Sequence, residues 1–213
     1  MTRALTGAIV GALILVACGG SSSSPPGPTA ATVAVKSGDV PSGMVKCDLT
    51  GDIDSFLGKV KTADPPTYQS TKAEWDQAKA SGAIAAYTAF YTDSNAHCTG
   101  ITSSGADIGS ASYKLVVNFV LQFKDDTQAA NGYTSKKVFN FSASDLKASR
   151  QPVVEGDKTG LSANSITLSQ AVGNQSFYIA IWQNKAFMVI LAVLNVDGAA
   201  SKKIATSANS RIK

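Results

Sequence analysis

The chain has 213 residues, a formal net charge of +4, 44% hydrophobic residues and three cysteines. This length is enough for one domain with a substantial core. So small a positive excess does not form the basic stripe that nucleic-acid-binding proteins carry. We therefore expect a single globular domain that does not bind nucleic acid.

The N-terminus has the three zones of an export signal. Arg3 is followed by an apolar run from Ala8 to Val16, which overlaps the stretch Leu15-Val16-Ala17-Cys18. Positive, apolar and cleavage zones occur in this order in secretory signals. The apolar run is about half of the ~20 residues that a membrane-spanning helix needs, so we expect no permanent span. A plain secretory signal, which needs only small residues at the cut, is the alternative interpretation.

The stretch Leu15-Val16-Ala17-Cys18 resembles the lipobox of bacterial lipoproteins, in which Leu, a small or branched residue, Ala or Gly, and Cys follow one another. The resemblance implies that residues 1–17 are removed, that Cys18 receives a diacylglycerol and that its amine is acylated, commonly with palmitate. It also implies a protein held on the extracytoplasmic face of a bacterial membrane, either the cell membrane or an outer membrane. The bilayer is then a partner, and this covalent lipid is the one non-protein group expected.

A spacer of low complexity follows the cysteine. Residues 19–31 are only Gly, Ser, Pro, Thr and Ala. Such a segment cannot bury enough apolar surface to offset the loss of chain entropy on folding, and its Ser-rich and Pro-rich halves favour flexible and extended chain, respectively. We interpret residues 18–45 as a lipidated N-terminus with a flexible linker, and residues 46–213 as one extracytoplasmic domain.

Two helices are predicted at the start of this domain. One apolar stripe at positions i, i+3, i+4 and i+7 indicates a helix that the sequence Asp64-Pro65-Pro66 ends. A second helix is expected to begin at Thr71, because Thr71 and Glu74 have capping-box spacing, and to end at Gly82. The stripe of the first helix consists of Ile53, Phe56, Leu57 and Val60.

Alternating apolar and polar residues then predict about five strands. A helix is expected after Asp125 or Asp126, and a last one after Asp197. Strands followed and separated by helices indicate an α+β fold, with a mainly antiparallel, twisted sheet and helices packed on one face. This order of elements is similar to that of many exported bacterial sensor and lipoprotein domains. The predicted strands are residues 83–93, 112–123, 164–172, 176–183 and 186–194.

The two remaining cysteines are expected to form a disulfide. With Cys18 assigned to the lipid, Cys47 and Cys98 are an even pair in an oxidising compartment. The alternative is a metal or nucleophile site at His97 and Cys98, in a segment that reads as a loop. A zinc site needs more nitrogen and sulfur ligands than this segment supplies.

No catalytic motif is recognisable. The chain lacks a Gly-x-Ser-x-Gly elbow, a His-Glu-x-x-His helix, a phosphate-binding loop and a dinucleotide fingerprint, and His97 is its single histidine. A Ser-His-Asp arrangement could only be built around that residue. We therefore expect a protein that is not an enzyme and has no catalytic or metal site.

The two strands at residues 176–183 and 186–194 are apolar on both faces. Either helices cover both faces, or the second face lines a groove for an apolar or aromatic ligand. Our first hypothesis is a membrane-anchored binding or sensor domain for an unknown small molecule or envelope protein. The alternatives are a carrier of lipid or another apolar molecule and, from a different class, an envelope hydrolase. The residues expected at the mouth of the groove are Tyr87, Tyr91, Tyr178 and Trp182.

Overall fold

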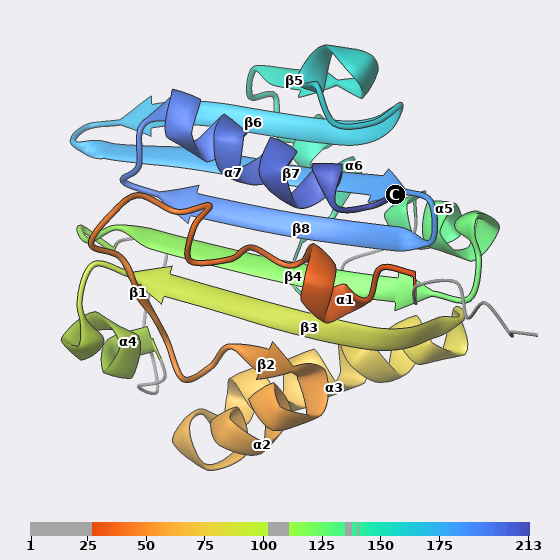
Figure 1. The fold of residues 1–213 in the computed structure, drawn as a ribbon, viewed down its shortest axis with the longest axis horizontal. Coiled ribbons are helices and arrows are strands. Elements are labelled where there is room, and N and C mark those ends of the chain that lie inside the picture. The colour runs from red at the N-terminus through yellow and green to blue at the C-terminus, as the bar shows by residue number, and fades with distance from the viewer. Residues whose placement is uncertain (1–26, 102–110, 135–137, 140) are drawn as a thin grey trace, which may run out of the picture.

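A computed structural model describes residues 27–101, 111–134, 138–139 and 141–213. The signal segment and Cys18 lie outside the described residues. The described part forms one antiparallel eight-stranded sheet in the order β1-β3-β4-β8-β7-β6-β5, with β2 also paired to β3 (Figure 1). The strands are β1 (Val45–Lys46), β2 (Gly51–Asp52), β3 (Ala83–Thr92), β4 (Leu115–Phe123), β5 (Val153–Glu155), β6 (Asn164–Val172), β7 (Gln175–Asn184) and β8 (Phe187–Leu194).

The predicted α+β class, the antiparallel sheet and the five long strands are confirmed. The sheet has eight strands in all, more than the predicted number of about five. Three further strands of two or three residues lie along the outer sides of β3 and β6. Segments this short carry no detectable alternation, and pairing with a long neighbour holds them extended. The central pair β4 and β8 joins the N-terminal half of the sheet to the C-terminal meander, with Phe119 opposite Ile190.

Helices cover both faces of the sheet, which is the first of the two interpretations of the doubly apolar strands, whereas the order of elements alone indicated helices on one face. We call the two faces the α2 face, to which Val117 and Phe119 of β4 belong, and the α7 face, to which Val116 and Val120 belong. Helices α1 and α7 lie on the near side in Figure 1, over the α7 face. The helical elements are α1 (Ala30–Val33), α2 (Ile53–Ala63), α3 (Pro65–Ala80), α4 (Asn95–Ile101), α5 (Asp126–Thr134), α6 (Ala143–Ala148), the 3₁₀ turn η2 (Gly156–Thr159) and α7 (Gly198–Ser210).

Residues 29–40, which we call the N-terminal strap, are part of the core of the α7 face. Val33 and Val35 are buried there, and the Val35 N–H donates to Oδ1 of Asn118 at 2.9 Å. At the other end of the chain, the Arg211 guanidinium donates to both carboxylate oxygens of Asp39, at 3.1 and 2.8 Å. The same guanidinium also donates to the carbonyls of residues 33 and 34.

The flexible linker predicted up to residue 45 is therefore too long, because folded chain begins near Thr29. Thr29 caps the single turn of α1, and its hydroxyl accepts from the Thr32 N–H. One helical turn followed by an extended segment is too short to produce a periodic pattern. Its burial depends on a sheet face formed by residues far along the chain.

Asp64 lies at the junction of α2 and α3 and belongs to both helices. It is the C-terminal cap of α2 and the N-terminal cap of α3, where its side chain accepts from the N–H and the hydroxyl of Thr67. The predicted end of the first helix is confirmed, whereas the predicted start of the second at Thr71 is wrong. Pro65 has no N–H and a fixed φ, which suits the first position of a helix, so the proline pair starts α3 immediately.

The predicted disulfide between Cys47 and Cys98 is present, with the two Cα atoms 5.3 Å apart. It fastens α4 to the segment between β1 and β2. The segment around His97, expected to be a loop, is part of helix α4. Because Cys98 is oxidised, it offers no thiolate to a metal or a substrate, and the alternative metal or nucleophile site is excluded.

Candidate functional site

The predicted aromatic groove is absent from the described part of the chain, because three of its four residues are core. Tyr91, Tyr178 and Trp182 are buried on the α7 face beneath the strap and α7, and only Tyr87 is half-buried. Burial raises the pKa of Tyr178 to about 12. The Tyr91 hydroxyl donates to the Val35 carbonyl at 3.1 Å, so this ring helps to hold the strap instead of facing a ligand.

A cavity of about 380 Å³ lies on the opposite, α2 face of the sheet. Helix α2, the start of α3 and the end of α4 border it on one side, and strands β3, β4, β7 and β8 form its floor. Its walls are almost entirely apolar. The lining residues are Leu49, Phe56, Val60, Asp64, Thr67, Thr71, Phe90, Ile101, Val117, Phe119, Phe139, Phe141, Phe177, Ile179, Ala192, Val193 and Leu194.

Four phenylalanine rings form a cluster at this cavity. Phe56 and Phe90 stack at 5.6 Å between ring centroids, and the ring of Phe119 meets both edge-on at 6.2 and 5.9 Å. Offset stacked and edge-to-face contacts are the favourable arrangements for aromatic pairs. The cavity therefore presents both ring faces and ring edges to an occupant.

Phe139 completes the cluster in an uncommon backbone conformation. Its φ is +50°, a left-handed value that costs a non-glycine residue about 1–2 kcal/mol. Its ring is buried and stacks on Phe119 at 4.6 Å. Phe139 therefore stacks on Phe119 from a strained backbone position in the segment that follows α5.

A polar rim occupies one part of the lining, and we define it as Asp64, Thr67 and Thr71. The Asp64 carboxylate accepts from the Thr67 N–H at 3.3 Å and from the Thr67 hydroxyl at 2.6 Å. Thr71 is only 6% exposed, and its hydroxyl makes no hydrogen bond to any residue that the structure describes. Asp64 and Thr67 are half-buried. The rim is the polar part of an otherwise apolar surface.

The one histidine belongs to a separate cluster beside the disulfide. His97 Nδ1 lies 2.5 Å from Oδ1 of Asp93, which requires the ring to donate, and the ring stacks on Tyr113 at 4.1 Å. Partial burial opposes ionisation of Asp93, but hydrogen bonds from His97 and from the Lys114 N–H hold the pKa of its carboxyl below the ordinary value. Among the described residues, Asp93 is the hydrogen-bond partner of this ring, and no nucleophile is bonded to it.

The described ranges contain no group of three or more His, Cys, Asp or Glu side chains that could hold a metal ion. Within those same ranges, no helix combines the length and the apolar character needed to cross a membrane.

The sequence analysis placed Phe56 on the apolar stripe of a helix and named no phenylalanine as a binding residue. One signal for the site was available in α3, where Thr67, Thr71 and Trp75 fall on one helical stripe at steps of four. Two threonines on the stripe that also carries Trp75 put polar groups on the inner side of the helix, and this much is visible in the sequence. The threonines could not be read in this way while α3 was expected to begin at Thr71.

Comparison with models of protein families found no match, and neither did comparison with curated proteins. Among solved structures, the chain is similar to the extracellular domain of PknH from Mycobacterium tuberculosis. The two are 13% identical with a TM-score of 0.50, over 85% of this chain and 93% of that one. At this identity the likeness is one of fold.

Proposed function

We propose that this protein is a lipid-anchored, extracytoplasmic binding domain that takes up an apolar small molecule in the cavity of the α2 face. The observation that carries the proposal is the cavity itself. Its volume of about 380 Å³ lies within the ~300–1,000 Å³ typical of small-molecule sites. Such sites are mostly hydrophobic and aromatic with a few polar groups, as this one is. The sensor and carrier hypotheses share this site.

Three further observations support an extracytoplasmic location. The similar solved structure is an extracellular domain, the disulfide between Cys47 and Cys98 suits an oxidising compartment, and the N-terminus resembles a lipoprotein signal. In the proposed protein, Cys18 carries the lipid. The ten residues from 19 to 28 form the tether, which reaches at most about 35 Å when fully extended.

A fluorescence titration tests the proposed cavity. The secreted form of the chain, residues 18–213 with Cys18→Ser, is titrated with N-phenyl-1-naphthylamine, an apolar dye whose emission rises on leaving water. Ala192 lies in the floor of the cavity on β8, so Ala192→Leu fills part of it. We expect a Kd at least tenfold weaker, with no loss of thermal stability.

The matched control is Ala171→Leu, the same substitution at an exposed position near the end of β6. This variant should bind the dye like the parent. Equal affinity in the parent and Ala192→Leu, or no saturable binding in the parent, would overturn the proposal.

Cell fractionation tests the anchor separately. We expect the wild-type protein in the membrane fraction with a mass increase that corresponds to acylation, and the Cys18→Ser protein in the soluble extracytoplasmic fraction without it. A Cys18→Ser protein that stays with the membrane in equal amount would refute lipid attachment at this residue, whatever the outcome of the dye titration.

A further inference from the structure

We infer that the cavity selects an amphiphile whose head group is neutral or cationic and donates hydrogen bonds, over an anionic amphiphile with the same apolar tail. This inference rests on the proposed function, because it names the class of ligand for the same cavity. It is carried by the polar rim.

The rim concentrates the polarity of the cavity at one place. Asp64, Thr67 and Thr71 are spaced i, i+3 and i+7 along the start of α3, so they lie above one another on one helix face. The rest of the lining is aliphatic or aromatic. A molecule that buries an apolar body against the phenylalanine cluster therefore has one location for a polar head.

The Asp64 carboxylate has capacity for further donors. A carboxylate offers about four acceptor positions, and the Thr67 N–H and hydroxyl occupy two of them. A hydroxyl or ammonium head can fill the others. A carboxylate head can only accept, so it would place two acceptors of the same charge against each other.

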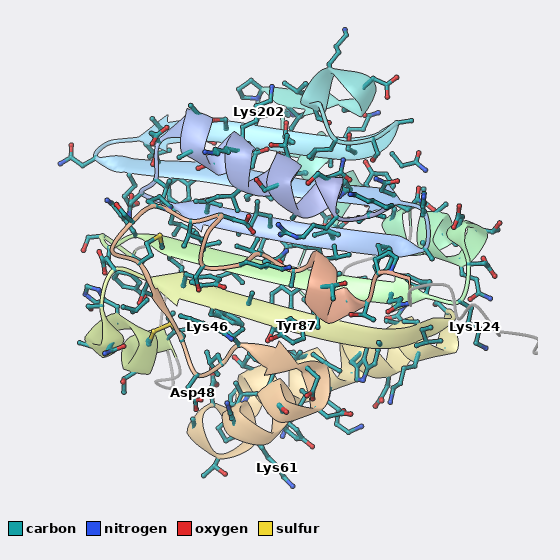
Figure 2. All side chains as sticks on the ribbon, viewed as in Figure 1. Lys46, Asp48, Lys61, Tyr87, Lys124 and Lys202 are labelled. Carbon is teal, nitrogen blue, oxygen red and sulfur yellow. A yellow bond between two sulfur atoms is a disulfide. The ribbon has the colours of Figure 1, made fainter. Side chains whose placement is uncertain are left out.

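The negative charge of Asp64 is not paired with a cation in the described part of the chain. No Lys, Arg or His nitrogen there lies within 4.0 Å of its oxygens. Lys61, three residues earlier, extends outward from α2 (Figure 2), and its ammonium lies 5.9 Å from the centre of the Tyr68 ring. The N-terminus of α3 contributes about half a positive charge, so the rim keeps a net negative charge.

Thr71 supplies the second, independent observation. The residue is only 6% exposed, it lines the cavity, and its hydroxyl makes no hydrogen bond to a described residue. A hydroxyl can donate one hydrogen bond and accept two, and a ligand that displaces water from the cavity without replacing those bonds would leave it unpaired, which is unfavourable. The head group of a bound ligand can provide that partner.

Competition between three ligands with one tail tests the inference. Decanol, decylamine and decanoate, each below its micelle-forming concentration, compete with N-phenyl-1-naphthylamine at pH 7.5 on residues 18–213 with Cys18→Ser. We expect decanol and decylamine to displace the dye at concentrations at least tenfold lower than decanoate.

Asp64→Asn isolates the charge, because asparagine caps a helix as well as aspartate does. In this variant we expect the preference for decylamine over decanoate to fall at least tenfold and the affinity for decanol to change less than threefold. Asp64→Ser repeats the test with a second neutral cap. Asp76→Asn is the matched control, since Asp76 is on the exposed side of the same helix, and it should leave all three affinities unchanged.

Thr71→Val removes the hydroxyl and keeps the shape. It should weaken decanol about threefold to tenfold more than it weakens the dye, which has no hydroxyl to pair with Thr71. If decanoate competes as well as decanol in the parent, or if both Asp64 variants keep the parent's preference, the head-group inference is wrong while the cavity proposal stands. If the dye itself does not bind, both are wrong.

Discussion

The side-chain amide of Asn118 holds the N-terminal strap on the sheet, and Asn118→Leu tests this attachment. Asn118 lies in the middle of β4 and is completely buried. Its Oδ1 accepts from the Val35 N–H and its Nδ2 donates to the Ile190 carbonyl, both at 2.9 Å. Leucine has nearly the same size and can make neither bond.

The expected cost follows from these two bonds. Leaving the buried Val35 N–H without a partner costs about 1–3 kcal/mol, and loss of the donor to the Ile190 carbonyl adds about 0.5–1.5 kcal/mol. The apolar side chain recovers part of this, so we expect a decrease of about 1–4 kcal/mol in the free energy of unfolding. For a domain of this size the corresponding fall in Tm is about 2–15 °C.

Chemical unfolding followed by tryptophan fluorescence measures the change, because Trp182 is buried on the same face. The control is Gln122→Leu. Gln122 is on the same face of β4, is half-buried and accepts from the Ala30 N–H at a longer 3.3 Å, so we expect a cost below about 1 kcal/mol. If Asn118→Leu costs no more than Gln122→Leu, the strap is not held by the Asn118 amide.

Three further predictions concern other contacts. Replacing Cys47 and Cys98 together by alanine opens a loop with a sequence separation of 51 and should lower the free energy of unfolding by about 4 kcal/mol in denaturant titrations; a loss below about 1 kcal/mol would contradict this. Arg211→Lys keeps the charge but loses most of the guanidinium bonds to the strap, so we expect about 1–3 kcal/mol of destabilisation, and an unchanged Tm would show that charge alone suffices. Asp93 has a lowered pKa in the folded state, so its stabilisation is complete above the ordinary carboxyl pKa and disappears as pH falls through the lowered one. The Tm of Asp93→Asn should therefore decrease less than that of the parent between pH 6 and pH 3, and parallel decreases would refute this role.

The sheet was predictable where local pattern and packing agree. Along β4, alternate residues from Leu115 to Phe123 are apolar and all belong to one face. The disulfide between Cys47 and Cys98 was predictable from the oxidising compartment and the even number of remaining cysteines, without knowledge of their distance. The strand and the disulfide could thus be inferred from one segment of sequence and from a count of residues, respectively.

The placement of the helices was not predictable in the same way. The apolar stripe of α7, with Ile204 and Ala208, is visible in the sequence, but nothing local specifies which face of the sheet it covers. It covers the face that carries Tyr178 and Trp182, so rings that alternation marked as a possible groove are core. The cavity on the other face of the sheet depends on how α2, α3 and the chain at Phe139 pack over the strands. The periodicity of apolar residues contains no information on the space that remains between packed elements.

The strap also determines how the domain would bear mechanical force. In a lipid-anchored protein, tension on the tether enters the fold at Thr29 and pulls directly on the strap. The bonds that resist it, from Asn118 and Arg211, lie on the α7 face, and Arg211 joins the strap to the end of the last helix. The cavity lies across the sheet from this attachment. If Cys18 carries the proposed anchor, a pull on the tether would therefore reach the strap on the α7 face before it reaches the phenylalanine cluster on the other side of the sheet.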